Sequence, residues 1–156
     1  MSEVEEMVGV QFARERLSDA WDEGQALVRA NYEETGILEG EKCTPDKGFY
    51  LNLEAVGKAI LFTARIEKKL IGYAIIMLSQ HAQYQALLWA MQDVLYVAPE
   101  HRGILSARFL EWQDETLEAA GVDIVYRHVN AKKDYSRLLE RMMYKEAERG
   151  YIRRFQ

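Results

Sequence analysis

The sequence has little cysteine, little proline and no excess of positive charge. Of its 156 residues, one is cysteine (Cys43) and two are proline, and the formal net charge is −5. A single cysteine cannot form an internal disulfide, which fits a reducing compartment. The acidic balance argues against general binding to nucleic-acid phosphates. A neutral or cationic substrate is easier to reconcile with this charge.

No stretch of the chain is long and apolar enough to cross a bilayer, and repeats and low-complexity runs are missing. The first ten residues, MSEVEEMVGV, are acidic where a secretory signal would be basic, so we expect a cytoplasmic protein without a membrane partner. Cys43 has neither a second cysteine nor a histidine cluster beside it, so we expect a loop thiol and no metal site. The length and the 49% hydrophobic content predict a single domain over residues 1–156.

Hydrophobic periodicity predicts a mainly helical front part. A short alternating piece over residues 7–12 precedes apolar residues at helical spacing over 16–34, with Gly36 as the stop. Thr44 and Pro45, a cap residue and a proline suited to the first turn, predict the start of a second helix that Gly57 ends.

Strand-forming runs dominate the middle of the chain. Residues 59–66 and 70–79 flank the polar Glu67-Lys68-Lys69, which is typical of an antiparallel hairpin. A third strand is expected over 86–97, after a turn in 80–85. The remaining expected elements are a helix from Pro99 to about residue 120 ended by Gly121, a fourth long strand over 122–129, a helix over 133–142 and a closing strand pair around Gly150.

This order of elements predicts an α+β fold. A strand, a helix and a further strand of these lengths imply a right-handed parallel crossover, whereas the hairpins are antiparallel. We therefore expect a central mixed, mostly antiparallel sheet with helices on both faces and one parallel strand-helix-strand crossover.

The stretch LYVAPEHRGILSARFL at positions 95–110 predicts a strand that ends before Pro99, a turn at Arg102 and Gly103, and then a helix. Together with the order of elements, this stretch resembles the Gcn5-related N-acetyltransferase (GNAT) superfamily, in particular the short acetyltransferase-like proteins of bacteriophages. The resemblance covers nearly the whole chain. It implies a GNAT-type sheet and acetyl-CoA as the cosubstrate.

The resemblance also implies where acetyl-CoA binds. The family loop has arginine or glutamine, two free positions, glycine, one free position, and glycine or alanine. Arg102 and Ala107 match, whereas Leu105 occupies the position of the central glycine. Backbone N–H groups at a helix start can hold a pyrophosphate. The Leu105 side chain therefore either hinders the close approach of the pyrophosphate to the backbone, which glycine would permit, or points into the core. The implied cofactor residues are Leu95, Tyr96 and Val97 for the pantetheine arm, Arg102, Gly103, Ile104, Leu105, Ser106 and Ala107 for the pyrophosphate, and Asn130 after the fourth strand.

Two further features of this region have open interpretations. Asn130 occupies the turn where family members contact the cofactor, and an Asx turn explains it equally well. Lys132 and Lys133 either meet the coenzyme phosphates or remain solvated.

Acetyl transfer requires an acid for the leaving thiolate and a base for the ammonium. The family pattern of a tyrosine, three residues, a glycine and an aromatic places Leu139 at the tyrosine and Met143 at the glycine. Tyr135, one helical turn earlier, is the substitute candidate for the acid. The base candidates are Asp93, Glu100, His101 and His128, and His128 is preferred because imidazole titrates near neutrality.

The resemblance therefore implies an acetyl-CoA-dependent N-acetyltransferase that acts on an amine of a small molecule or a protein. The alternative is a catalytically silent module of the same fold that binds and modulates a host protein. It is favoured by the missing glycines at Leu105 and Met143 and by the missing tyrosine at Leu139. A homodimer through the terminal strands is compatible with either function.

Overall fold

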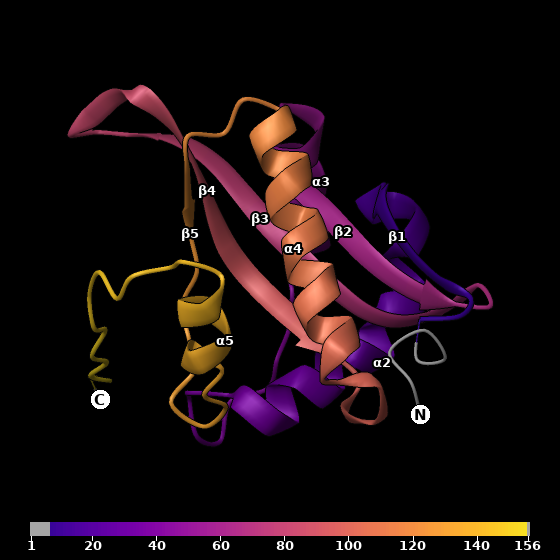
Figure 1. Cartoon of the computed structure of the whole chain (residues 1–156). Helices are drawn as coiled ribbons and strands as arrows, with labels where there is room; N and C mark the ends of the chain where they lie inside the picture. The colour runs from indigo at the N-terminus through magenta and orange to yellow at the C-terminus, as the bar shows by residue number, and fades with distance from the viewer. Residues whose placement is uncertain (1–6, 156) are drawn as a thin grey trace.

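A computed structural model of the chain describes residues 7–155. One five-stranded sheet with the strand order β1-β2-β3-β4-β5 forms its centre (Figure 1). The first four strands pair antiparallel, and β5 runs parallel to β4. The strands are β1 (Val10–Glu15), β2 (Ala59–Ile66), β3 (Lys69–His81), β4 (Tyr84–Val97) and β5 (Ile124–Tyr126).

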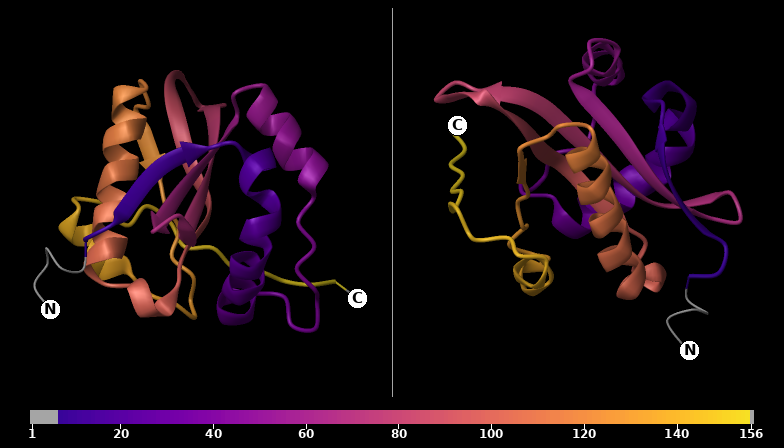
Figure 2. Two further views of the ribbon diagram at one scale, coloured as in Figure 1. Left: turned by 90° about the vertical axis from the view of Figure 1, so that its right-hand side faces the viewer. Right: turned by 45° about the horizontal axis from the view of Figure 1, so that its top comes forward.

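Helices cover both faces of this sheet. Helix α4 lies on one face, and α2 and α3 lie on the other (Figure 2). The α4 face is the larger core and includes Phe62, Phe109 and Leu117, each 0% exposed. The helical elements are α2 (Leu17–Thr35), α3 (Lys47–Ala55), the 3-10 turn η1 (Pro99–His101), α4 (Ile104–Ala119) and α5 (Ser136–Arg141). None of the helices in residues 7–155 is both long and apolar enough to span a bilayer.

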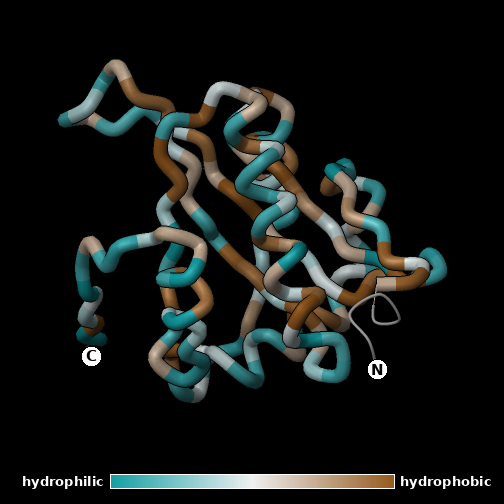
Figure 3. The backbone as a smooth tube through the Cα atoms, viewed as in Figure 1, coloured by the Kyte–Doolittle hydropathy of each residue, from teal (hydrophilic) through white to brown (hydrophobic). Residues whose placement is uncertain are grey.

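Burial of both faces explains why the central strands are apolar in unbroken runs. Along β2, Ile60 and Phe62 face the α4 core, whereas Ala59 and Leu61 face α2 and α3. Successive side chains of a strand point to opposite faces, so a sheet covered twice needs apolar residues at consecutive positions. The hydrophobic colouring of Figure 3 accordingly runs through the central strands.

The structure confirms the predicted hairpin at residues 67–69. Glu67 and Lys68 have φ values of 47° and 72°, the left-handed pair that matches the twist of two adjoining strands. The next hairpin is longer than predicted, because β3 continues to His81 and β4 begins at Tyr84. Ring contacts of His81 with Tyr84 and Trp89, at centroid distances of 5.1 and 4.8 Å, account for the extra length.

Helix boundaries agree in part with the predictions. The first helix lies as expected, and Gly121, with φ of 87°, follows the end of α4. Thr44 and Pro45 do not start the second helix, which begins at Lys47. The cap is Asp46, whose carboxylate accepts a 2.9 Å hydrogen bond from the Phe49 backbone N–H.

The C-terminal third shows the largest corrections to the predicted fold. The fourth strand spans three residues in place of eight, and α5 is shorter than the predicted helix over 133–142. The predicted closing pair around Gly150 does not form within the described residues, so the terminal-strand dimer loses its basis. Residues 145–149, KEAER, offer no alternating apolar face, and the side chains of Tyr151 and Phe155 are exposed to solvent. The mixed, mostly antiparallel sheet and the parallel β4-α4-β5 crossover are confirmed.

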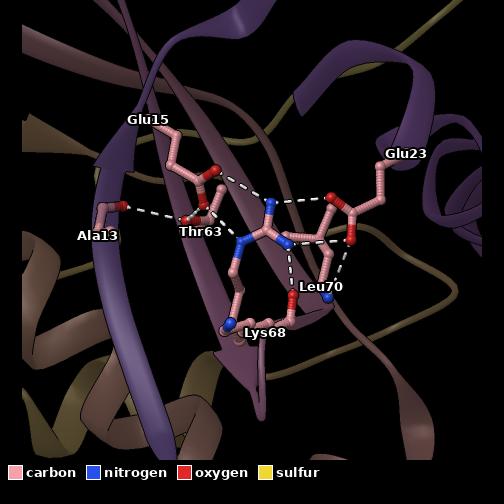
Figure 4. Close-up of polar contacts among 7 residues, drawn as sticks. Ala13, Glu15, Glu23, Thr63, Lys68 and Leu70 are labelled. Carbon is pink, nitrogen blue, oxygen red and sulfur yellow. Dashed lines mark hydrogen bonds and ion pairs between the residues drawn. The ribbon is translucent and has the colours of Figure 1, made fainter. Parts of the chain in front are cut away.

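An ion-pair cluster around Arg65 ties the first strand and the first helix to the β2-β3 hairpin (Figure 4). Glu15 on β1 and Glu23 on α2 both bind the guanidinium, with hydrogen bonds of 2.8 to 3.0 Å, and the Lys68 carbonyl accepts a fifth bond at 2.7 Å. All five guanidinium donors are used, and these bonds hold the pKa of both glutamates below its usual value. The buried Thr63 hydroxyl also donates to Glu15.

We expect Arg65→Met to lower the free energy of unfolding by about 1–3 kcal/mol at neutral pH. Most of the loss should come from Glu15, because Glu23 is 47% exposed and water screens its charge. The pKa of each carboxyl group is lowered by folding, so its contribution is full above the ordinary glutamate pKa and is lost as pH falls through the lowered value. Urea denaturation from neutral pH to pH values below 4.5, the ordinary value, should therefore show the difference from the unmodified protein shrinking.

Arg108→Met is the matched control, since the Arg108–Glu111 pair is exposed on α4. We expect it to change stability by less than about 0.5 kcal/mol. Equal effects of the two substitutions would contradict the assigned role of the Arg65 cluster.

Candidate functional site

A cavity of about 1200 Å³ lies where β4 and β5 diverge, and we call it the central cavity. The two strands pair only over three residues of each, Trp89 to Met91 with Ile124 to Tyr126. Beyond this pairing, no described strand lies beside residues 92–97 on that side of β4. The cavity is lined by residues of α2, α3, the central strands, the start of α4, the segment after β5 and α5.

A β-bulge in β4 shapes the middle of this cavity. Ile76 pairs with Gln92 and Ile75 with Val94, so Asp93 is the extra residue without a partner on β3. Bulges bend a strand and redirect its side chains. Gln92 is buried and turns toward the segment after β5, whereas Asp93 accepts a 2.6 Å hydrogen bond from the Tyr50 hydroxyl on α3.

The helix start predicted to bind pyrophosphate borders the cavity. Gly103 precedes α4 with φ of 98°, and no side chain caps the first turn. The first N–H groups of a helix have no partner within it, so this end of α4 offers hydrogen-bond donors. Gly103, Ile104, Ser106 and Ala107 line the cavity.

Leu105 points away from the cavity and into the core. Its side chain is 3% exposed and packs in the cluster of Phe109 and Leu117. Of the two readings that the sequence leaves open, the structure shows the core-facing one. Of the three β4 residues expected to meet the pantetheine arm, Leu95 and Val97 line the cavity, and the Tyr96 side chain is buried on the α2 face.

The Arg102 guanidinium is bound within the protein. It donates to the Val97 carbonyl at 2.8 Å and to Glu34 at 2.7 Å, above the Tyr96 ring at 5.6 Å. Lys133 pairs with the same Glu34 carboxylate at 3.1 Å. These two cations, with the Arg102 hydrogen bond as the larger influence, lower the pKa of Glu34.

The segment after β5 is also fastened to the end of α2. The Asn130 side chain donates to the Thr35 carbonyl at 2.7 Å and accepts from the Lys132 backbone N–H at 2.8 Å, which is the Asx turn considered from the sequence. The Lys132 ammonium donates to the Gly36 carbonyl at 2.6 Å. Asn130, Lys132 and Lys133 therefore contact protein groups and bridge the two sides of the cavity.

Tyr135 places its hydroxyl between the diverging strands. The hydroxyl accepts from the Gln92 amide at 2.9 Å and donates to the His128 carbonyl at 3.0 Å. Burial raises the pKa of Tyr135, so the group stays protonated at neutral pH. The His128 side chain is exposed and lines the cavity, whereas Glu100 and His101, in η1, are not among its lining residues.

Sequence reasoning missed a buried network that holds Gln92. The Arg127 side chain is 0% exposed and pairs with Asp114 at 2.6 Å. It also donates to Gln92 at 3.0 Å, to Gln113 at 3.2 Å and to the Tyr144 hydroxyl at 3.0 Å. One signal in the sequence could have indicated this network. Gln113 falls on the apolar stripe of α4, four residues from Phe109, and a buried polar side chain needs hydrogen-bond partners.

The structure shows how the chain accommodates Met143 and Leu139, two positions that depart from the motif. Met143 adopts a φ of 69°, the left-handed conformation that glycine favours, at the position where the family has glycine. Leu139 is 7% exposed and packs in the interior. The following Tyr144 donates to Asp114 at 2.8 Å, and burial raises its pKa to about 12.

Comparison with solved structures identifies proteins of the same fold. An aminoglycoside acetyltransferase from an uncultured soil metagenomic sample, in complex with sisomicin, has a TM-score of 0.71 at 16% identity, with 96% of each chain covered. A ribosomal-protein-alanine N-acetyltransferase from Brucella melitensis biovar Abortus 2308 has a TM-score of 0.70 at 21% identity, covering 94% of this chain and 99% of that one. A predicted acetyltransferase from Clostridium acetobutylicum, with acetyl-CoA, has a TM-score of 0.69 at 10% identity, covering 93% and 96%.

Sequence comparisons give no such relatives. No family model matches the chain, and no curated protein matches it. The structural likeness shows the fold alone: over nearly the whole chain, it is the fold of these acetyltransferases.

Because the Leu105 side chain lies in the core, its truncation should destabilise the protein. Leu105→Ala should lower the free energy of unfolding by about 2–4 kcal/mol, because it removes core contacts and leaves a cavity. Ser106→Ala is the control, because Ser106 is the next residue of the same helix turn and lines the cavity. It should change the free energy of unfolding by less than about 1 kcal/mol. Denaturant unfolding measures both, and a small loss for Leu105→Ala would contradict its placement in the core.

Proposed function

We propose that this protein transfers the acetyl group of acetyl-CoA to an amine. The observation that carries the proposal is the gap between β4 and β5, which has an uncapped helix start at one end and a protonated tyrosine hydroxyl inside it. The fold shared with acetyltransferases supports the same reaction class.

The residues around the gap fit acetyl-CoA. The first N–H groups of α4 and its dipole suit a diphosphate, with Gly103, Ile104, Ser106 and Ala107 beside it. Residues 92–97 of β4 have no β5 partner, so backbone groups on that side are open to the amides of an extended pantetheine arm. Acetyl-CoA supplies an activated thioester.

Tyr135 is the proposed acid. As the amine nitrogen bonds to the thioester carbon and the carbon–sulfur bond breaks, the departing sulfur takes the proton of the Tyr135 hydroxyl. Gln92 holds that hydroxyl in place, and the raised pKa of Tyr135 keeps its proton available. A solvent proton then restores the hydroxyl.

Asp93 is the proposed partner of the substrate ammonium. Its carboxylate lies at the bulge, on the face of the sheet covered by α2 and α3, and Tyr50 fixes its orientation. From there it can orient the ammonium and accept its proton. His128, whose side chain is open to the cavity, is the second candidate for the base.

One observation favours the alternative of a silent binding module: Glu34 already pairs with Arg102 and Lys133, two cations near the expected phosphate site. Binding of acetyl-CoA separates the two functions, because a silent module that has lost its cosubstrate would not bind it.

We expect acetyl-CoA to bind with a dissociation constant of about 1 μM, and Ser106→Asp to weaken this binding at least about tenfold. An aspartate in the first turn favours the helix through its dipole, so weaker binding would come from repulsion of the diphosphate and not from unfolding. Isothermal titration calorimetry measures both affinities. Ser18→Asp, which adds the same charge to the first turn of α2, should leave binding unchanged. No heat from the unmodified protein at millimolar acetyl-CoA would refute the enzyme.

We expect Tyr135→Phe to lower kcat about 10- to 100-fold and to leave the affinity for acetyl-CoA within about twofold, because the acid acts only as the thiolate leaves. Thiol release in steady state gives kcat, and calorimetry gives the affinity. Tyr84→Phe, in the exposed β3-β4 turn, is the control. Unchanged kcat in Tyr135→Phe removes Tyr135 from the mechanism.

A further inference from the structure

The part of the central cavity under α2 and α3 differs in charge from the rest, and we call it the acceptor half. Asp93 is its only charged lining residue among the described residues. The other charged lining residues come from the loop before α4, from α4, from the segment after β5 and from α5, and two of them, Arg102 and Lys133, pair with Glu34 at the end of α2: Arg102, Arg108, Glu111, Lys133, Asp134 and Arg141. A ligand in the acceptor half therefore meets one negative charge.

The carboxylate of Asp93 has capacity for a cation. Its Oδ2 accepts the Tyr50 hydroxyl at 2.6 Å, and no described Lys or Arg forms an ion pair with it. Glu34 differs, since Arg102 and Lys133 both pair with it. The Asp93 carboxylate can therefore bind an ammonium through charge-assisted hydrogen bonds, which are stronger than those to a neutral donor.

The wall beside Asp93 is aromatic and aliphatic. The rings of Trp21 and Tyr50 lie 6.0 Å apart, and Tyr73 and Ile75 form part of the floor on the sheet. Lys47 lies 6.0 Å from the Trp21 ring centroid and pairs with Asp22 at 3.9 Å, so this pair adds no net charge at that end. A second ammonium on the same ligand would therefore lie against aromatic and aliphatic side chains, with no second carboxylate among the described lining residues of this half.

We infer that the acceptor is a small monoamine with an aromatic or apolar body, its ammonium at Asp93 and its body between Trp21, Tyr50 and Tyr73. The inference rests on the proposed acetyl transfer and narrows its acceptor. Polyamines and aminoglycosides fit less well, because their further ammonium groups find no second carboxylate among the described residues that line the acceptor half. An aromatic body buries more apolar surface against this wall and also forms ring-to-ring contacts with it.

Acetylation of a panel of amines tests the inference. The probes are 2-phenylethylamine, hexylamine, spermidine, sisomicin and a tetrapeptide with an N-terminal alanine, each with acetyl-CoA and thiol detection. We expect kcat/KM for 2-phenylethylamine to exceed that for spermidine, sisomicin and the peptide at least about tenfold. An equal or higher value for any of these three overturns the inference.

Two substitutions locate the effect. Asp93→Asn keeps the shape and the Tyr50 hydrogen bond, and should lower kcat/KM for 2-phenylethylamine about tenfold or more, with acetyl-CoA affinity within about twofold. Asp22→Asn on α2 makes the same charge change at a side chain that is 95% exposed and outside the cavity, and should have no effect. Trp21→Ala should reduce the preference for 2-phenylethylamine over hexylamine. Equal losses in Asp93→Asn and Asp22→Asn would contradict the assignment.

Calorimetry with 2-phenylethylamine separates the acceptor class from the reaction. Binding that is lost in Asp93→Asn, without any acetylation, supports the acceptor half and refutes acetyl transfer. Binding of acetyl-CoA together with preferred acetylation of spermidine or sisomicin refutes the monoamine and leaves acetyl transfer intact. If neither monoamine binds or is acetylated, the inference is wrong.

Discussion

The buried Arg127–Asp114 ion pair is the constraint on which the site depends. Arg127 follows the last residue of β5, and its guanidinium turns inward to Asp114 on α4 and to Gln92 on β4. A buried cation needs its partners, and removal of one typically costs about 3–5 kcal/mol. The Arg127 side chain thus ties the end of β5 to α4 and to Gln92 at the point where the pairing of β4 with β5 stops. The central cavity opens directly beyond this anchored point.

The bulge at Asp93 gives two neighbouring residues of one strand two different environments. Gln92 belongs to the buried network and holds Tyr135 in the gap, whereas Asp93 faces α3 and holds the ammonium in the proposed reaction. The acid and the ammonium partner are therefore set by consecutive residues of the same strand. Because the backbone joins Gln92 and Asp93, the separation of these two residues is fixed by the sheet.

Local sequence signals predicted the elements that depend on local energetics. Periodicity located α2 and α4, and the polar turn at Glu67 and Lys68 located the central hairpin. The length of β5 could not be predicted in this way, because it depends on Arg127 meeting Asp114 and Gln92, which lie 13 and 35 residues away. The site shows the same division. The helix start was predicted from the motif, and Tyr135 was predicted only as a substitute for the tyrosine that the motif lacks at Leu139. The core-facing direction of Leu105 and the pairing of Glu34 with Arg102 required the packed structure.

The Glu34 ion pairs join the acceptor wall to the cofactor loop. Glu34 lies at the end of α2, which forms part of the acceptor half, and it binds Arg102 beside the start of α4 and Lys133 after β5. The Asn130 bond to the Thr35 carbonyl and the Lys132 bond to the Gly36 carbonyl add two neutral acceptors to the same junction. A shift of α2 away from the sheet would break all four contacts at once. The end of α2, the Arg102 loop and the segment after β5 therefore behave as one packed unit, and a ligand that displaces Glu34 from Arg102 also loosens the wall of the acceptor half.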